Sequence, residues 1–246
     1  LLYPTFKQIS VQEILQKMIS IIIPTYNEAE HILWLIDHLK QYGNNAIAEI
    51  IVADGGSNDN TVALALSTGA TAKVSPQKGR AAQMNFGATL ATGTIFYFVH
   101  ADTLPPKTFL SDIENAVKDG YGFGRYRTKF DSKKWILKVN AFFTRFDLFI
   151  SNGGDQTLFM SKELFNAING FNASMRIMED YDIVTRAKQK ATYKIIQKTV
   201  LVSTRKYETN TWWQVLKANY TIINMYKNGA SQDAMVNKYK AMLSYR

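Results

Sequence analysis

Cysteine is absent from this chain of 246 residues, and its absence excludes two kinds of structure. Without thiols the protein has neither a disulfide framework nor a cysteine-ligated zinc site. A chain without disulfides fits a reducing compartment, so we expect a cytoplasmic protein, with the inner face of the membrane as a second location.

Long apolar runs are also missing. No run approaches the ~20 residues that a membrane-spanning helix needs, and the longest one near the start, at residues 19–23, ends at Pro24. Residues 1–17 lack the basic flank and small-residue cleavage site of a signal peptide, so we expect them to be an extension outside the core fold. Hydrophobic residues still make up 46% of the chain, which is ample for a buried core.

Acidic residues are scarce relative to basic ones, and the net charge is +9. The excess is local, because residues 121–150 carry seven Lys or Arg and two acids, and residues 203–246 carry the same numbers. Together these segments hold +10, which leaves −1 for the rest of the chain. A basic surface can serve nucleic acid, anionic lipid headgroups or a phosphorylated substrate. It can also be an ordinary solvated helix face.

Two β-loop-α units begin the chain. Residues 20–24 form a short buried strand, and apolar side chains at helical spacing predict a helix over 28–42. A second strand is predicted at 49–53, with a turn at 54–61 and a helix at 62–67. In that turn Asp59 or Asn58 can cap the helix, so only Asp54 lacks an obvious structural role.

The stretch around Asp102 carries the clearest chemical signal. Residues 95–99 are typical of a strand buried on both faces of a parallel sheet, and Asp102 follows directly. Open α/β sheets bind ligands at this edge, and a carboxylate there can hold Mg²⁺ or Mn²⁺ against a diphosphate. The alternative is an aspartate that caps the helix predicted to begin at Pro105.

A glycine flanked by two cations precedes the helix that ends near Gly93. Lys78, Gly79 and Arg80 at this position favour phosphate, because free backbone amides and the helix dipole add to the side-chain charges. The spacing matches neither the P-loop nor the dinucleotide fingerprint, so a basic surface loop is an equal alternative.

The second half of the chain has a different pattern. Residues 121–130 predict an edge strand with one face in water, and residues 133–150 predict a helix with an aromatic stripe. Such a stripe is usually part of a core, although the lysines beside it also permit a dimer contact or a membrane-surface face. Residues 212–226 and 233–245 predict two C-terminal helices.

Three acids precede the helix that contains Arg186. Glu179, Asp180 and Asp182 are favourable at a helix N-terminus for the dipole alone. They would also supply a general base together with its orienting partners.

With these motifs in order, the chain resembles the family 2 glycosyltransferases, inverting enzymes of the GT-A fold that use nucleotide-diphospho-sugars. The motifs are Pro-Thr-Tyr-Asn-Glu at 24–28, Asp-Gly-Gly-Ser-x-Asp-x-Thr at 54–61, the strand end at Asp102, and Glu179-Asp180. A closer likeness is to a bacterial subgroup described as associated with radical-SAM or selenium-related proteins. It rests on Gly79-Arg80-Ala81-x-Gln83-Met84-Asn85, His100-Ala101-Asp102-Thr103 and Gly154-Asp155-Gln156.

The resemblance, which runs from Met18 to about residue 200, implies an α/β fold with a Rossmann-like, mostly parallel sheet flanked by helices. The catalytic domain would span 18–205, with a nucleotide-sugar half at 18–103 and an acceptor half at 104–205. A helical segment would follow at 206–246.

The resemblance also implies roles for individual residues. Asp54 would read the base, commonly the uracil imide, Asp102 would ligate Mg²⁺ or Mn²⁺, and Asp180 would be the catalytic base, with Glu179 near the acceptor. The residues implied to bind the nucleotide-sugar are Pro24, Thr25, Tyr26, Glu28, Asp54, Gly55, Lys78, Arg80, Asn85 and Ala101.

One position departs from the family pattern, because His100 stands where the family has the first Asp of its Asp-x-Asp motif. This histidine is a candidate second metal ligand, a hydrogen-bond partner, or a structural residue. The acceptor is a hydroxyl compound of unknown kind. The aromatic, basic helices permit a lipid-linked acceptor at the membrane, and equally a homodimer.

Two other functions compete with glycosyl transfer. A nucleotidyltransferase also combines an α/β sheet, a metal-binding Asp and a nucleotide, but it usually has a glycine-rich loop after the first strand, where this chain has residues 24–27. A nucleic-acid or membrane-surface module could use the two basic segments, but the acids at three successive turns would repel a polyanion.

Overall fold

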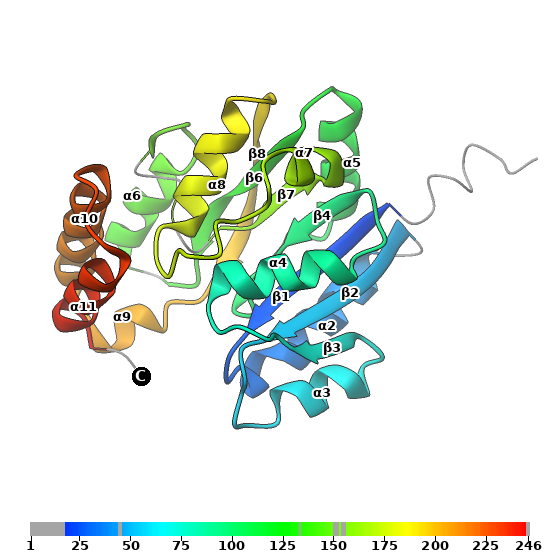
Figure 1. The fold of residues 1–246 in the computed structure, drawn as a ribbon, viewed down its shortest axis with the longest axis horizontal. Helices are drawn as coiled ribbons and strands as arrows, with labels where there is room; N and C mark the ends of the chain where they lie inside the picture. The colour runs from blue at the N-terminus through cyan, green and yellow to red at the C-terminus, as the bar shows by residue number, and fades with distance from the viewer. Residues whose placement is uncertain (1–17, 44–45, 133, 150–152, 154–155, 245–246) are drawn as a thin grey trace, which may run out of the picture.

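The computed structural model describes residues 18–43, 46–132, 134–149, 153 and 156–244. A single sheet runs through the molecule in the strand order β3-β2-β1-β4-β7-β6-β8-β5, with helices on both of its faces (Figure 1). The predicted extension at 1–17 and the motif residues Gly154 and Asp155 lie outside the described residues, as do Lys133 and Ile150 at the ends of the predicted aromatic helix.

The first half of the sheet is parallel, as predicted. Strands β1 (Ile19–Thr25), β2 (Ile47–Asp54) and β3 (Thr71–Val74) lie side by side, and β4 (Ile95–Phe98) pairs with the other side of β1. The connecting helices are α2 (Ala29–Gly43), α3 (Thr61–Ser67) and α4 (Arg80–Leu90). Because β1 and β2 are in register at Thr25 and Asp54, the turns that follow both strands lie next to each other.

The second half mixes directions. Strand β7 (Leu158–Ser161) pairs antiparallel with both β4 and β6 (Phe123–Phe130), β8 (Tyr193–Val202) is parallel to β6, and the short β5 (Thr103–Leu104) closes the far edge against β8. The helices here are α5 (Phe109–Lys118), α6 (Trp135–Phe143), α7 (Lys162–Ala167) and α8 (Glu179–Lys188). This mixed, mostly parallel sheet with helices on both faces agrees with the α/β fold expected from the sequence.

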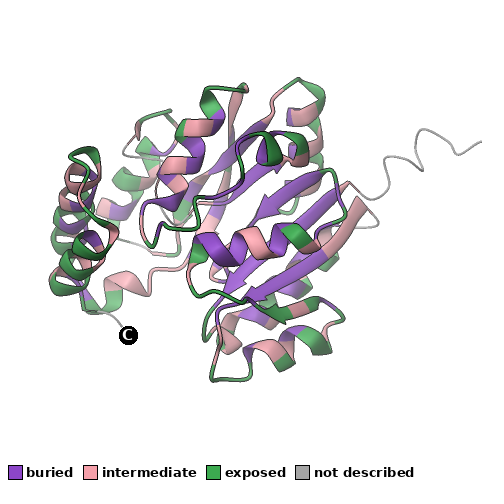
Figure 2. Cartoon of the chain, in the orientation of Figure 1, coloured by how far each residue is buried: buried purple, intermediate pink, exposed green. Residues whose placement is uncertain are grey.

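Hydrophobic cores cover both faces of the sheet. One contains the apolar stripe of α2 and the inward side chains of β1 and α5, and the other contains residues of α4, α7 and α8. The central strands β1, β4 and β7 are largely buried, whereas the edge strand β3 and the outer faces of the helices are exposed (Figure 2). The C-terminal helices are α9 (Lys206–Thr209), α10 (Trp212–Lys227) and α11 (Gln232–Met242). Helices α10 and α11 are attached through a separate cluster, in which Ile222 and Met235 pack against Met178 and Tyr181 at the start of α8.

Two predictions about the second half are wrong. Strand β6 is not an edge strand, because it lies between β7 and β8. Its Arg125 is 2% exposed and donates to the carbonyl oxygens of Thr144 (2.7 Å) and Phe146 (3.3 Å). The guanidinium, which was expected to face solvent, therefore forms its hydrogen bonds inside the protein. Most of the aromatic stripe predicted at 133–150 is not part of a core either, since Trp135 is 71% and Phe142 45% exposed, although Phe149 packs against a core cluster.

Membrane-spanning helices were not expected. Among the described residues, none of the helices combines the length and the hydropathy that a bilayer crossing requires.

Candidate active site

The turns after β1 and β2 are held to each other by side-chain hydrogen bonds. The Asn27 backbone N–H donates to Ser57 Oγ (2.8 Å), while Asn27 Oδ1 accepts from the Asn58 N–H (2.9 Å). The Glu28 N–H donates to Thr61 Oγ1 at 2.8 Å. The motifs at 24–28 and 54–61 therefore form one structural unit at the carboxyl ends of adjacent parallel strands, where α/β sheets bind ligands.

Asp54 lies beneath this unit and is completely buried. Its Oδ1 accepts from Thr25 Oγ1 (3.0 Å) and Ser57 Oγ (2.5 Å), and its Oδ2 accepts from the N–H groups of Gly56 (2.8 Å) and Ser57 (2.7 Å). The prediction that Asp54 lacks a structural role is therefore wrong, because the carboxylate shapes the turn. Its contact with a nucleotide base stays a prediction.

Helix α4 ties the two strand ends to the rest of the site. The buried Gln83 donates through Nε2 to the carbonyl oxygens of Thr25 (2.7 Å) and Ala53 (2.8 Å). The helix begins at Arg80 after Gly79, which has a φ of 119° and leaves the first amides of the helix without a side-chain cap. An uncapped helix N-terminus favours an anion, in agreement with the predicted phosphate position.

Lys78 extends toward the same place. A Cβ atom added at Gly56 would lie 3.6 Å from Lys78 Cε, so the lysine stem passes over the turn at 54–57. The Lys78 side chain is exposed, which leaves its amine accessible to a ligand. Gly55 is buried against Gln83. A Cβ atom added at Gly55 would lie 3.1 Å from the Gln83 side-chain amide, so a larger residue would crowd this contact.

Asp102 occupies the turn between β4 and β5. The Thr103 N–H donates to the His100 carbonyl oxygen (3.0 Å), and the Ser203 N–H donates to the Asp102 carbonyl oxygen (3.1 Å). Helix α5 begins only at Phe109 with Thr108 as its N-cap, so Asp102 does not cap it, and that alternative is excluded.

Arg205 joins two of the predicted site residues, although the sequence pattern did not single it out. Its Nη2 donates to both oxygens of Glu28, at 2.9 and 3.0 Å, and lies 3.4 Å from Asp102 Oδ2. Arg205 follows closely after β8 ends, and a polar residue at the end of a strand was the one signal that could have found it. The guanidinium thus brings residues 28, 102 and 205 to one point.

The electrostatics of this contact follow from partial burial. Burial raises the pKa of Glu28, and the hydrogen bond and charge of Arg205 offset only part of that effect. Burial also opposes the charge of Arg205, but Glu28 and Asp102 outweigh it and raise the pKa of the guanidinium. A cationic side chain is therefore held firmly beside Asp102.

The acidic segment at the start of α8 reaches the same edge through α4. Arg80 Nε lies 3.3 Å from Glu179 Oε1, and the Glu179 side chain is only 5% exposed. Met178, directly before the helix, has a φ of 70°, which residues other than glycine rarely adopt. Asp180, the next residue of the first turn, is half-buried, while Asp182 pairs with Arg186 at 2.5 Å.

Three predicted donor-binding residues have structural roles. Asn85 donates to the Phe171 carbonyl oxygen (2.7 Å) and accepts from the Phe171 N–H (2.9 Å), so both ends of its amide hold the loop before α8. Ala101 is 4% exposed and packs in the core, and Pro24 is buried within β1. For Ala101 and Pro24 a side-chain contact with a ligand is not supported, because both residues are buried, whereas the half-buried Asn85 uses both ends of its amide on Phe171.

The donor set for a metal is small. Within the part of the chain that the structure describes, no group of three or more His, Asp or Glu side chains could hold a metal ion. A cation shared with substrate phosphates needs only one or two carboxylates, and the Asp102 side chain is 31% exposed. The residues present therefore fit a metal that is held jointly with a diphosphate, with the half-buried His100 adjacent in the turn.

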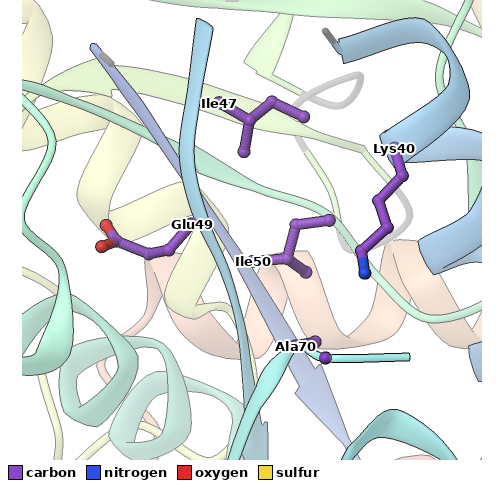
Figure 3. A pocket seen from close by; sticks show the side chains of 6 residues that line it. Lys40, Ile47, Glu49, Ile50 and Ala70 are labelled. Atoms are coloured by element: carbon purple, nitrogen blue, oxygen red, sulfur yellow. The ribbon is translucent and has the colours of Figure 1, made fainter. Parts of the chain in front are cut away.

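Two measurable hollows lie away from this edge. The one in Figure 3, of about 230 Å³, is lined by Lys40, Ile47, Glu49, Ile50, Gly69 and Ala70, at the amino end of β2. Its polar groups already have partners, because Lys40 donates to the Thr68 carbonyl oxygen and Glu49 accepts from Ser20 and Thr92. The second, of about 300 Å³, lies beside Asn85 and Asn169. Of the predicted site residues, Asn85 lines the second hollow and none lines the first.

Comparison with known protein families identifies the family of this chain. The family model described as glycosyl transferase family 2 matches residues 20–177. The chain belongs to this family. The matched segment includes the two hydrogen-bonded turns after β1 and β2, Asp102 and the loop that leads to α8.

Individual relatives are more distant. An uncharacterized glycosyltransferase of Rickettsia bellii is 36% identical over 104 residues, which is 42% of this chain and 34% of that protein. The mannosyltransferase PcManGT of Pyrobaculum calidifontis, solved with GDP-Man and Mn²⁺, has a TM-score of 0.65 at 15% identity and covers 92% of this chain and 70% of that one. Glucosyl-3-phosphoglycerate synthase of Mycobacterium tuberculosis has a TM-score of 0.60 at 15% identity, with 99% and 86% covered. The chain spans about a third of the length of the curated relatives it matches.

Proposed function

We propose that this protein transfers a sugar from a nucleotide-diphospho-sugar to a hydroxyl acceptor, with inversion at the anomeric carbon. The observation that carries the proposal is the pair of arginine contacts at the carboxyl edge of the sheet. Arg205 joins Glu28 to Asp102, and Arg80 joins the start of α4 to Glu179. These contacts involve five segments that are distant in the chain, and they support one site beside the uncapped N-terminus of α4, which Gln83 joins to the ends of β1 and β2.

The nucleotide-sugar donor would lie across the two turns that follow β1 and β2. Thr25, Tyr26 and Asp54 would border the nucleoside. Tyr26 is half exposed, so its ring is available to a base, whereas Thr25 and Asp54 are buried beneath the turns, and the Asp54 carboxylate would have to exchange one of its hydrogen bonds to reach a base. Lys78 and the N-terminus of α4 would contact the diphosphate. A uridine nucleotide is the proposed donor, since the family position of Asp54 commonly reads the uracil imide.

Asp102, with His100 as a second candidate, would hold Mg²⁺ or Mn²⁺. A bound cation supplies charge neutralisation at the leaving diphosphate. Arg205 stands 3.4 Å from Asp102 and would have to yield part of that contact when a cation and diphosphate bind. The residue then adds its own positive charge to the same phosphate group.

Asp180 is the proposed base. It would accept the proton of the acceptor hydroxyl as that oxygen attacks the anomeric carbon from the face opposite the diphosphate. Glu179 is held by Arg80 and would orient the acceptor. We also propose the domain limits 18–205 and 206–246, membership of the bacterial subgroup identified by residues 79–85 and 100–103, and a cytoplasmic location.

Asp180→Asn tests the base directly. General-base contributions are about 10²- to 10⁴-fold, so we expect a loss of that size in sugar transfer or donor hydrolysis while UDP still raises the melting temperature. Asp182→Asn, which changes an acid already paired with Arg186, is the matched control. Unchanged turnover in Asp180→Asn would remove this residue from the role.

Asp102→Ala tests the metal. A thermal-shift screen of nucleotide diphosphates and their sugars, with and without Mn²⁺, should show metal-dependent stabilisation of the wild type. The variant should lose the metal-dependent part of the shift. The same shift in both proteins would contradict the role of Asp102.

A further inference from the structure

Helix α6 carries an apolar face that none of the described residues covers. Trp135, Val139, Phe142 and Phe146 follow one another at helical spacing along α6 and its end, and all are exposed. Leu137 is the one buried residue of α6, on the side that packs against β6. The stripe therefore points away from the sheet.

A second exposed stripe lies on α10. Trp213, Leu216 and Tyr220 are exposed on the side opposite the buried Val215 and Ile222. The two regions are connected, because Phe149, just after α6, packs with the cluster of α10 and has Lys227 Nζ 5.0 Å from its ring centroid. In Figure 1 both helices lie at the end of the molecule toward which β1 and β2 point.

Cations surround these aromatic side chains. Lys134 and Lys138 are exposed on α6, Lys217 is exposed on α10, and Arg145 stacks 3.9 Å from the centroid of the Phe142 ring. The exposed Asp147 nearby is paired with Lys188. Not every basic residue of the segments 121–150 and 203–246 lies on this surface, since Arg125 is buried and Arg205 pairs with Glu28.

We propose that this surface, defined by Trp135, Val139, Phe142, Phe146, Trp213, Leu216 and Tyr220 with their flanking lysines, docks the protein on an anionic lipid membrane. Tryptophan and tyrosine partition to the headgroup level of a bilayer, where an apolar helix face enters the acyl boundary and lysines meet anionic headgroups. The positive charge of the flanking lysines is complementary to anionic lipid headgroups, which favours a membrane over a second copy of the protein. A two-fold contact between two copies would place the same basic segment against itself.

The docked orientation follows from the fold. Because the carboxyl edge of the sheet faces the end that carries α6 and α10, the surface would bring the candidate active site toward the lipid. Membrane binding requires neither a nucleotide-sugar nor catalysis, so it can be tested independently of the proposed glycosyl transfer.

Vesicle co-sedimentation tests the proposal with the full chain and no nucleotide. We expect binding to vesicles of phosphatidylglycerol and phosphatidylcholine in equal parts, none to phosphatidylcholine alone, and weaker binding as salt is raised. Lys134→Gln with Lys138→Gln should weaken binding about fivefold for each lysine. Trp135→Ser with Trp213→Ser should weaken it about tenfold or more.

Matched controls lie on other elements. Trp34→Ser on α2, and Lys73→Gln on β3 with Lys118→Gln on α5, change exposed side chains outside this surface and should leave vesicle binding unchanged. Circular dichroism melting should be the same for every variant, because the altered side chains are exposed.

Three results would overturn the proposal. The first is no binding to the anionic vesicles, and the second is binding that the α6 and α10 variants leave unchanged. The third is a different occupant of the same surface. It would appear as a dimer in sedimentation velocity that Trp135→Ser dissociates, or as single-stranded RNA that displaces the vesicles.

Discussion

Helices α2 and α6 carry the same kind of sequence signal and use it in opposite ways. Each has apolar side chains spaced along one helical face, at 32, 35, 36 and 39 in α2 and at 135, 139, 142 and 146 in α6. In α2 the stripe is completely buried against the sheet, whereas in α6 every member of the stripe is exposed. Periodicity therefore identified the apolar face in both helices but not what covers it.

The difference lies in the neighbouring elements. The sheet face above α2 is lined by β1, β4 and α5, whose apolar side chains need a cover. The part of β6 under α6 instead presents the guanidinium of Arg125, which takes its acceptors from the end of α6. A helix held partly by polar contacts can leave its apolar face to another partner.

The largest contrast should appear in large-to-small substitutions on the two stripes. Leu35→Ala on α2 should lower the free energy of unfolding by about 2–5 kcal/mol, because a filled core position becomes a cavity. Phe142→Ala on α6 should cost less than about 1 kcal/mol, mainly from its contact with Arg145. Urea unfolding measures both. Equal losses would mean that α6 is covered in solution.

Polar side chains should follow the same rule as apolar ones. Gln83→Ala removes a donor from two buried carbonyl oxygens and should cost about 1–3 kcal/mol. Gln41→Ala, on the exposed side of α2, should change stability by less than about 0.5 kcal/mol. The same urea titration compares the two variants. A Gln83 variant as stable as the Gln41 variant would show that the contact with the strand ends is not needed for folding.

The smallest contrast concerns acids and depends on pH. Burial opposes ionisation of Glu49, but hydrogen bonds from Ser20, Thr92 and Gly93 outweigh it and lower its pKa from 4.5. A lowered folded pKa stabilises the protein above pH 4.5, and this stabilisation is lost as the pH falls through the folded value. Glu49→Gln should therefore be less stable than wild type by under about 1 kcal/mol at neutral pH, and the difference should shrink in acid.

Asp147, in the exposed pair with Lys188, supplies the control for that titration. Asp147→Asn should cost about 0–1 kcal/mol at low salt and less at high salt, since exposed ion pairs are screened. A Glu49 difference that grows as the pH falls would contradict the sign derived from its hydrogen bonds.

Most of the site could be predicted because strand ends carry a local signature. A buried apolar run followed by a carboxylate places Asp54 and Asp102 at the edge of a parallel sheet without any tertiary information. Arg205 could not be predicted in the same way. It lies 177 residues from Glu28 in the chain, and only the packing of β8 beside β5 and β6 brings the two together.

Residues with two uses were the hardest to assign. The family resemblance implies a donor-binding role for Asn85, yet both ends of its amide bind Phe171. Arg125 indicated an exposed strand because a guanidinium is usually solvated, yet carbonyl oxygens from a later segment satisfy it. In both cases the partner is distant in the sequence, so no local pattern contains it.

The sequence alone determined the order of strands and helices, the family motifs and the face of each helix that is apolar, because these depend on residues within a few positions of one another. The tertiary structure decided which apolar faces are covered, which carboxylates are already occupied, and that Arg205 stands beside Asp102. Those outcomes depend on contacts between residues far apart in the chain, and only packing selects among the partners that each side chain could accept.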